Sequence, residues 1–135
     1  MSIKVIGVES VLAELKELSD SKKIEKGVAR GCMVVEAAAK KKAPKDTGAL
    51  ISSITYEVDG TTGTVFTPLF YAPYIEFGTG LFGEKGGRKD VPWRYQADDG
   101  SWYTTSGQKP QPFMRPALND NRGEILRAIA EGLSR

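Results

Sequence analysis

The stretch Asp46-Thr47-Gly48-Ala49 matches a known catalytic sequence literally. These residue types carry the catalytic aspartate of retroviral-type aspartic peptidases, where two such aspartates share a proton and activate water. In those enzymes the motif ends an apolar strand, whereas here it follows the charged segment Lys41-Lys42-Ala43-Pro44-Lys45. A turn or helix cap uses the same residues, because Asp and Thr accept from free backbone N–H groups and Gly tolerates unusual dihedral angles. A dimeric peptidase using Asp46 is therefore an alternative hypothesis, and we expect no catalytic residue.

The glycines at positions 78, 80, 83, 86 and 87 have the composition of a phosphate-binding loop. Such a loop continues with lysine and then serine or threonine, but here Glu84 follows Gly83. Because a carboxylate repels phosphate, the sequence argues against a nucleotide site. Glu76 lies among aromatic residues without a paired acid at a fixed spacing, which favours a structural ion pair or hydrogen bond over a catalytic role.

The chain contains one cysteine, Cys32, and no histidine. Without histidine the usual zinc and iron ligand sets cannot be assembled, and serine or cysteine hydrolases lack their commonest general base. We therefore expect no metal, no cofactor and no enzymatic activity.

A cluster of aromatic and basic residues in the second half of the chain could bind single-stranded nucleic acid by stacking. Its members are Arg88, Lys89, Trp93, Arg94, Tyr95, Trp102 and Tyr103. The formal net charge is only +2, from 19 basic and 17 acidic residues, unlike strongly basic nucleic-acid-binding domains. The favoured interpretation is that the cluster packs on its own core or on a neighbouring subunit, where aromatics and arginine are enriched. A nucleic-acid module that also uses Lys40-Lys41-Lys42 is the alternative, the other reading of these lysines being a solvated helix end.

The spacing of apolar residues predicts the elements that position these side chains. Ile3, Val5 and Ile6 indicate an opening strand, followed by a one-sided helix over 8–18. A long helix is predicted from about 21 to 42, with Pro44 ending it. Its apolar stripe is Ile24, Val28, Cys32, Val35 and Ala39. Gly27 and Gly31 beside the stripe predict close packing against a sheet or helix.

Alternation from Ile51 to Pro68 around Asp59-Gly60 predicts a β-hairpin. Residues 78–89 are expected to form a mobile loop, and residues 93–105 a second hairpin around Asp98-Asp99-Gly100. A closing helix is predicted from about Arg115, with an apolar spacing of Leu118, Ile125, Leu126, Ile129 and Leu133.

At 135 residues the chain is expected to form one domain, 1–135, with 78–109 as a flexible loop and hairpin insertion. The predicted fold class is α+β, with a curved antiparallel sheet packed against the long helix and the C-terminal helix. The apolar runs are far too short to cross a bilayer, so we expect no membrane contact and a protein made and kept in the cytosol.

Four ordered segments of the chain resemble the minor tail-component family of siphoviruses, the long-tailed bacteriophages, and of prophages. They are the opening strand and helix, residues 43–50 followed by Ile54, residues 71–79, and residues 110–118. The positions that carry the resemblance are Pro44, Thr47, Gly48, Leu50, Tyr71, Ala72, Tyr74, Glu76, Phe77, Gly78, Thr79, Pro112, Phe113, Pro116, Ala117 and Leu118. In that family Pro-x-x-Thr-Gly-x-Leu marks the passage from the long helix into the sheet, which implies a structural position for Asp46.

The resemblance implies a structural subunit of the virion tail or neck, assembled in the host bacterial cytoplasm. Such a subunit forms a homo-oligomeric ring, with hexameric symmetry expected, that completes the tail or joins it to the head. Tail terminator is the alternative station. The implied partners are the tail tube, the tail terminator or head connector proteins, and DNA passes nearby without specific binding.

Overall fold

The computed structural model describes residues 1–4, 21–45, 48–84 and 90–134. The chain divides into two compact units. The core unit comprises Met1–Leu69 with Phe113–Arg135, and the insert unit comprises Phe70–Pro112. Helices and antiparallel strands are both present, so the predicted α+β class is confirmed. The predicted helix over 8–18, Val5, Ile6, Asp46, Thr47, Arg88 and Lys89 lie outside the described residues.

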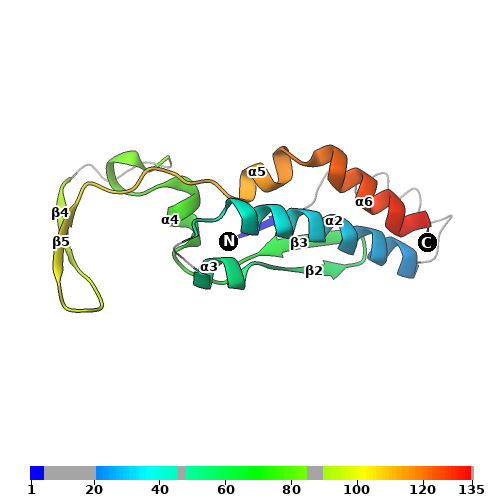
Figure 1. Ribbon diagram of the computed structural model, residues 1–135, viewed down its shortest axis with the longest axis horizontal. Coiled ribbons are helices and arrows are strands. Elements are labelled where there is room, and N and C mark those ends of the chain that lie inside the picture. Colours follow the sequence, from blue (N-terminus) through cyan, green and yellow to red (C-terminus); the bar gives the residue numbers. More distant parts are fainter. Residues whose placement is uncertain (5–20, 46–47, 85–89, 135) are drawn as a thin grey trace. The chain divides into compact units, whose positions relative to one another are not determined.

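The long helix α2 (Ser21–Lys42) is the central element of the core unit, and its predicted bounds are confirmed. Every member of its apolar stripe is buried, from Ile24 to Ala39. The amide of Ala43 still donates to the carbonyl of Ala39 (2.9 Å), after which Pro44 stops the helix because it has no N–H to donate. The helix contacts the sheet and the two C-terminal helices, so it organises the core (Figure 1).

The sheet of the core unit is antiparallel and has the strand order β1-β3-β2. Its strands are β1 (Ser2–Lys4), β2 (Thr55–Asp59) and β3 (Thr62–Phe66). The hairpin predicted around Asp59-Gly60 is therefore present. On β3, Gly63 and Val65 are buried and alternate with half-buried neighbours, as expected for a strand with one face on a core. A Cβ on Gly63 would overlap Sγ of Cys32, so this glycine lets α2 lie close to the sheet.

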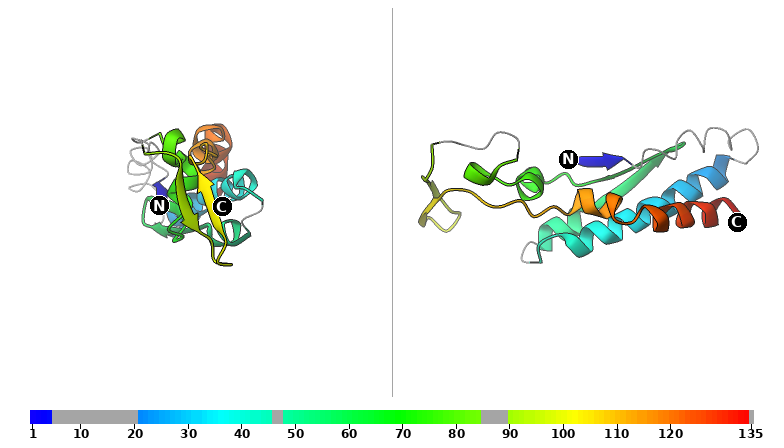
Figure 2. Two further views of the ribbon diagram at one scale, coloured as in Figure 1. Left: turned by 90° about the vertical axis from the view of Figure 1, so that its left-hand side faces the viewer. Right: turned by 90° about the horizontal axis from the view of Figure 1, so that it is seen from above.

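Glycines also bring α2 close to the last helix, α6 (Arg122–Ser134), which runs along it in the right-hand view of Figure 2. A Cβ on Gly132 would stand 2.5 Å from Cα of Gly27, and one on Gly31 would stand 2.8 Å from Cγ1 of Ile129. Real Cβ atoms do not come so close, so the helix backbones contact each other directly at Gly27 and Gly132, and the side chain of Ile129 packs directly on Gly31. The close packing predicted for Gly27 and Gly31 is thus confirmed, with a helix as the neighbour.

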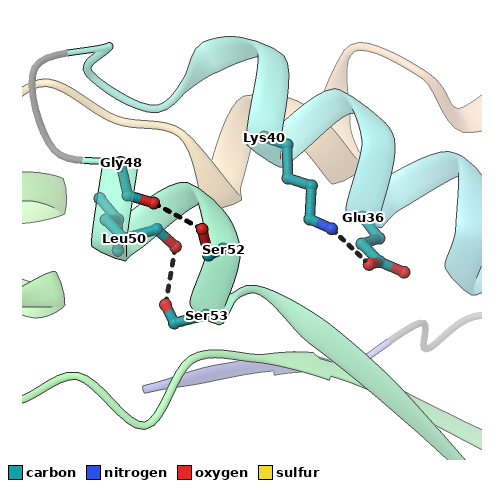
Figure 3. A network of polar contacts seen from close by, with 6 residues as sticks. All are labelled: Glu36, Lys40, Gly48, Leu50, Ser52 and Ser53. Atoms are coloured by element: carbon teal, nitrogen blue, oxygen red, sulfur yellow. Dashed lines mark hydrogen bonds and ion pairs between the residues drawn. The ribbon is translucent and has the colours of Figure 1, made fainter.

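The prediction of a strand from Ile51 was wrong at its start, because the residues up to Ser53 belong to the short helix α3 (Gly48–Ser53). Two side-chain hydrogen bonds support the helical turn: Ser52 Oγ donates to the carbonyl of Gly48 (2.8 Å) and Ser53 Oγ to that of Leu50 (2.7 Å) (Figure 3). Leu50 is fully buried at the same time. Local serine bonds and one buried leucine therefore override the β-branched composition.

The prediction of a single closing helix was also wrong, because the segment is divided into α5 (Met114–Asn119) and α6. At the break, Asn121 Nδ2 donates to the carbonyl of Ala117 (3.0 Å), and the carbonyl of Asn121 accepts from the amide of Ile125 (2.9 Å). The break resets the helical face, so α6 buries Ile125 and Ile129 while Leu126 is 52% exposed.

The insert unit begins with a helix that the periodicity did not predict, α4 (Ala72–Phe77), which has Pro73 in its first turn. The expected loop after it contains a 3-10 turn, η1 (Gly80–Phe82), so its beginning is ordered. The second predicted hairpin is confirmed as β4 (Trp93–Gln96) and β5 (Trp102–Thr105), paired antiparallel.

Replacing Gly132 by alanine is expected to destabilise the core unit, because the new methyl group meets the backbone of Gly27, which cannot move aside. The expected loss is about 1–3 kcal/mol in the free energy of unfolding, measured by urea denaturation. Gly123→Ala in the same helix is the control, since a Cβ there meets nothing within 4 Å. It should be neutral or stabilising by up to about 1 kcal/mol. Equal effects of the two changes would refute the close helix contact.

Candidate functional site

The residues that could do chemistry do not form a reactive centre in the described part of the chain. No group of three metal-ligating side chains occurs there. Glu76 on α4 is completely buried, and none of the buried side-chain nitrogen or oxygen atoms in that part lacks a hydrogen-bond partner. These are the surroundings of a structural carboxylate. None of the described helices combines the length and apolarity needed to cross a membrane.

Most backbone amides of the described glycine-rich segment already donate to carbonyl groups of the chain. The amide of Thr79 donates to the carbonyl of Gln108 (3.0 Å) and the amide of Leu81 to that of Ser106 (2.8 Å). The amides from 82 to 84 donate to carbonyls of Thr79, Gly80 and Phe77. A phosphate loop points such N–H groups at its ligand, so this segment is built for a structural purpose.

That purpose is to tie together the two chain passages that lead into and out of the second hairpin, which we name the stem (residues 78–82 and 106–110). Besides its backbone bonds, the amide of Gln108 donates to Oγ1 of Thr79 (3.0 Å). The passages approach so closely that a Cβ on Gly80 would stand 2.8 Å from Cα of Gly107. The stem therefore fixes the base of the hairpin within the insert unit.

The hairpin β4–β5 presents aromatic residues on both faces. On one face Tyr95 and Tyr103 are a cross-strand pair, with ring centroids 5.7 Å apart and planes inclined by 28°. On the other face, the Trp102 face, the Arg94 guanidinium lies 5.1 Å from the ring centroid of Trp102. The rings are 46%, 48% and 58% exposed for Tyr95, Tyr103 and Trp102. These rings are thus largely exposed within the insert unit, and their packing on the core or on a neighbouring subunit stays a prediction.

The described basic residues of the nucleic-acid hypothesis belong to two different units. Lys40 pairs with Glu36 four residues earlier (2.9 Å, Figure 3), while Lys41 and Lys42 are exposed at the end of α2. Arg94 belongs to the insert unit and stacks on Trp102. The nucleic-acid hypothesis stays a prediction.

The positions that carry the family resemblance lie at junctions and in cores. Pro44 follows α2, and Gly48 and Leu50 are in α3. Most of the 71–79 segment forms α4, of which Ala72 and Glu76 are buried and Tyr74 is exposed, with Gly78 and Thr79 entering the stem. Pro112 ends the insert unit, and Phe113, Pro116, Ala117 and Leu118 begin the return to the core unit, with Phe113 and Ala117 buried.

A groove on the core unit was missed by sequence reasoning. It lies between α2 and the start of α6, and we name it the α2–α6 groove. Its lining residues are Met33, Val34, Ala37, Ala38, Lys41, Asn121 and Glu124. Met33 is 50% exposed. The available signal was that Met33 and Ala37 are apolar although they lie off the stripe of α2.

The buried thiol of Cys32 is expected to be unreactive in the folded protein. Burial, together with the nearby negative charge of Glu36, raises the pKa of the Cys32 thiol from 9.0 to about 11. Labelling with a thiol reagent at pH 8 should be slow in buffer and complete in urea. Because the folded state holds the proton more tightly, stability is unaffected below pH 9 and falls between about pH 9 and 11. Cys32→Ala should show a shallower fall over that range, and equal slopes would contradict the assignment.

Replacing Gly107 by alanine is expected to disrupt the stem, because its φ is +116° and a Cβ would overlap the backbone of Thr79. The near-ultraviolet circular dichroism of the hairpin aromatics should decrease, while the far-ultraviolet signal of the helices should remain. Gly100→Ala is the matched control, since its φ is +86° but no atom lies within 4 Å of the new Cβ. Gly100→Ala should lower the free energy of unfolding by only the roughly 1–2 kcal/mol that a left-handed backbone conformation costs. Identical spectra for both variants would show that the stem is not needed.

Comparison with known proteins gives one match and two negative results. The family described as "Bacteriophage HK97-gp10, putative tail-component" matches residues 9–78. Curated proteins and solved structures gave no match. The matched segment covers more than half of the 135 residues and includes α2, the hairpin β2–β3 and α4. The chain therefore belongs to the HK97 gp10-like family of bacteriophage tail components.

Proposed function

We propose that this protein is a structural subunit of the virion neck or tail that assembles into a ring and completes the tail or joins it to the head. The proposal rests on the exposed aromatic and arginine side chains of the hairpin. They belong to a member of a tail-component family. Trp102, Tyr95 and Arg94 are of the residue types that dominate the energy of protein interfaces. The protein acts by docking, without making or breaking a bond.

A ring of identical subunits would need a docking surface of this kind. In a closed ring each subunit contacts the next through two different, complementary patches. Exposed aromatic rings on a well-braced hairpin suit one of them, because two rigid aromatic side chains lose little conformational entropy on docking. The hairpin residues Trp93, Arg94, Tyr95, Trp102 and Tyr103 are thus the proposed interface, together with Arg88 and Lys89 next to it in sequence.

The proposed partners are further copies of the chain, in a hexameric ring, and the tail tube, tail terminator or head connector proteins above and below. Alternatively, the same ring is the tail terminator. DNA would pass through the centre without sequence-specific contacts, which agrees with a nearly balanced charge of +2.

The purified protein, alone or mixed with tail tubes, is expected to form sixfold rings in negative-stain electron microscopy. Multi-angle light scattering should report the corresponding mass. A protein that stays strictly monomeric and never joins tails would refute the proposed function.

Trp102→Ala should weaken ring formation or tail attachment at least tenfold, because a central interface tryptophan is worth about 2 kcal/mol or more. The melting temperature should change little, since the side chain is more than half exposed in the subunit. Thr55→Ala, at an exposed position on the sheet, is the control and should assemble normally. Unchanged assembly of the tryptophan variant would remove the hairpin from the interface.

A further inference from the structure

We infer that the Trp102 face of the hairpin in one copy docks into the α2–α6 groove of a second copy. The inference rests on the proposed function and names the two surfaces that would alternate around the ring. One surface belongs to the insert unit and the other to the core unit.

The distribution of exposed apolar side chains selects the groove. Among the described residues, the large exposed apolar side chains are Met33, Phe70, Tyr74, Leu81, Phe82, Tyr95, Trp102, Tyr103 and Leu126. Only Met33 and Leu126 belong to the core unit. Of these two, Met33 lines the α2–α6 groove. An aromatic anchor needs a pocket in its partner, so the groove is a core-unit surface that fits.

The groove has the shape and chemistry to receive an indole. Its lining includes Ala37 and Ala38, which are small enough to leave room for a ring, and Val34 adds apolar contact. Met33 supplies a flexible thioether, which makes favourable contacts with aromatic rings. Trp102 is the most exposed ring of the hairpin, so it would bury the most surface there.

Charges at the two surfaces are complementary. The groove carries exposed Lys41 from the end of α2 and exposed Glu124 from the first turn of α6. The hairpin carries exposed Arg94 beside Trp102 and exposed Asp98 at its turn. Each surface thus offers at least one cation and one anion beside apolar side chains, so Arg94 can face Glu124 while Asp98 faces Lys41. Such pairs mainly fix orientation and partner choice.

The contact can be tested by cross-linking two single-cysteine surfaces in trans. An affinity-tagged Met33→Cys variant is mixed with an untagged Thr104→Cys variant, whose cysteine lies on the Trp102 face and leaves Trp102 and Arg94 in place. A short bis-maleimide is added at pH 7. Native Cys32 gives little background because it is buried with a raised pKa. A heterodimer of intermediate size is expected, and each variant alone should stay uncross-linked. Thr55→Cys mixed with Thr104→Cys is the control and should give no heterodimer.

A second variant tests the groove without cysteine chemistry. Ala37→Arg would fill the groove with a long charged side chain at an exposed helix position, so folding should be preserved and ring formation should fall at least tenfold. Thr55→Arg is the size-matched control. Rings that form normally with Ala37→Arg, or that form without the heterodimer, overturn this inference and leave the proposed function intact. Absence of rings from the unchanged protein overturns both.

Discussion

Helix α2 meets α6 with no side chain between the two backbones, because glycine occupies Gly27 on one helix and Gly132 on the other. On its other side the helix packs its Cys32 and Val28 side chains directly on Gly63 of the sheet. A core in which glycine allows such close approach on two sides of one helix has little free volume, and packed interiors of this kind do not deform gradually. The position of α6 along α2, and with it the groove that they form, therefore depends on Gly27 and Gly132 having a hydrogen atom where other residues have a Cβ.

The insert unit follows a different principle. It has few buried apolar residues, and its order comes from backbone hydrogen bonds in the stem and from the antiparallel pairing of β4 with β5. Its aromatic rings are thus available for a partner without loss of internal packing. A tightly packed core unit and an insert unit with exposed rings together suit the role in association that we propose for this HK97 gp10-like tail component.

Sequence reasoning identified the elements with strong periodicity and missed those set by local bonds. The stripe of α2 and both hairpins follow from spacing and turn residues alone, and all are present. Helix α3 escaped prediction because serine hydroxyl groups and buried Leu50 outweigh β-branched composition. The break before α6 depends on the side chain of Asn121, which no periodicity reveals. The aromatic hairpin was predicted as a candidate surface, whereas the groove needs the relative placement of two helices far apart in the sequence.

The stem lies between the hairpin β4–β5 and the rest of the insert unit. Its two passages are joined by backbone bonds from Thr79 and Leu81 and by a bond from the amide of Gln108 to Oγ1 of Thr79. None of these bonds uses a side chain of the hairpin, so the sequence of the hairpin can vary while the stem keeps them. Recombination among related genes could replace the hairpin by a segment of different length and sequence. Such an exchange would change the partners of a virion component while the core unit stays unchanged. The same site is a natural point for grafting a foreign peptide or a fluorescent label.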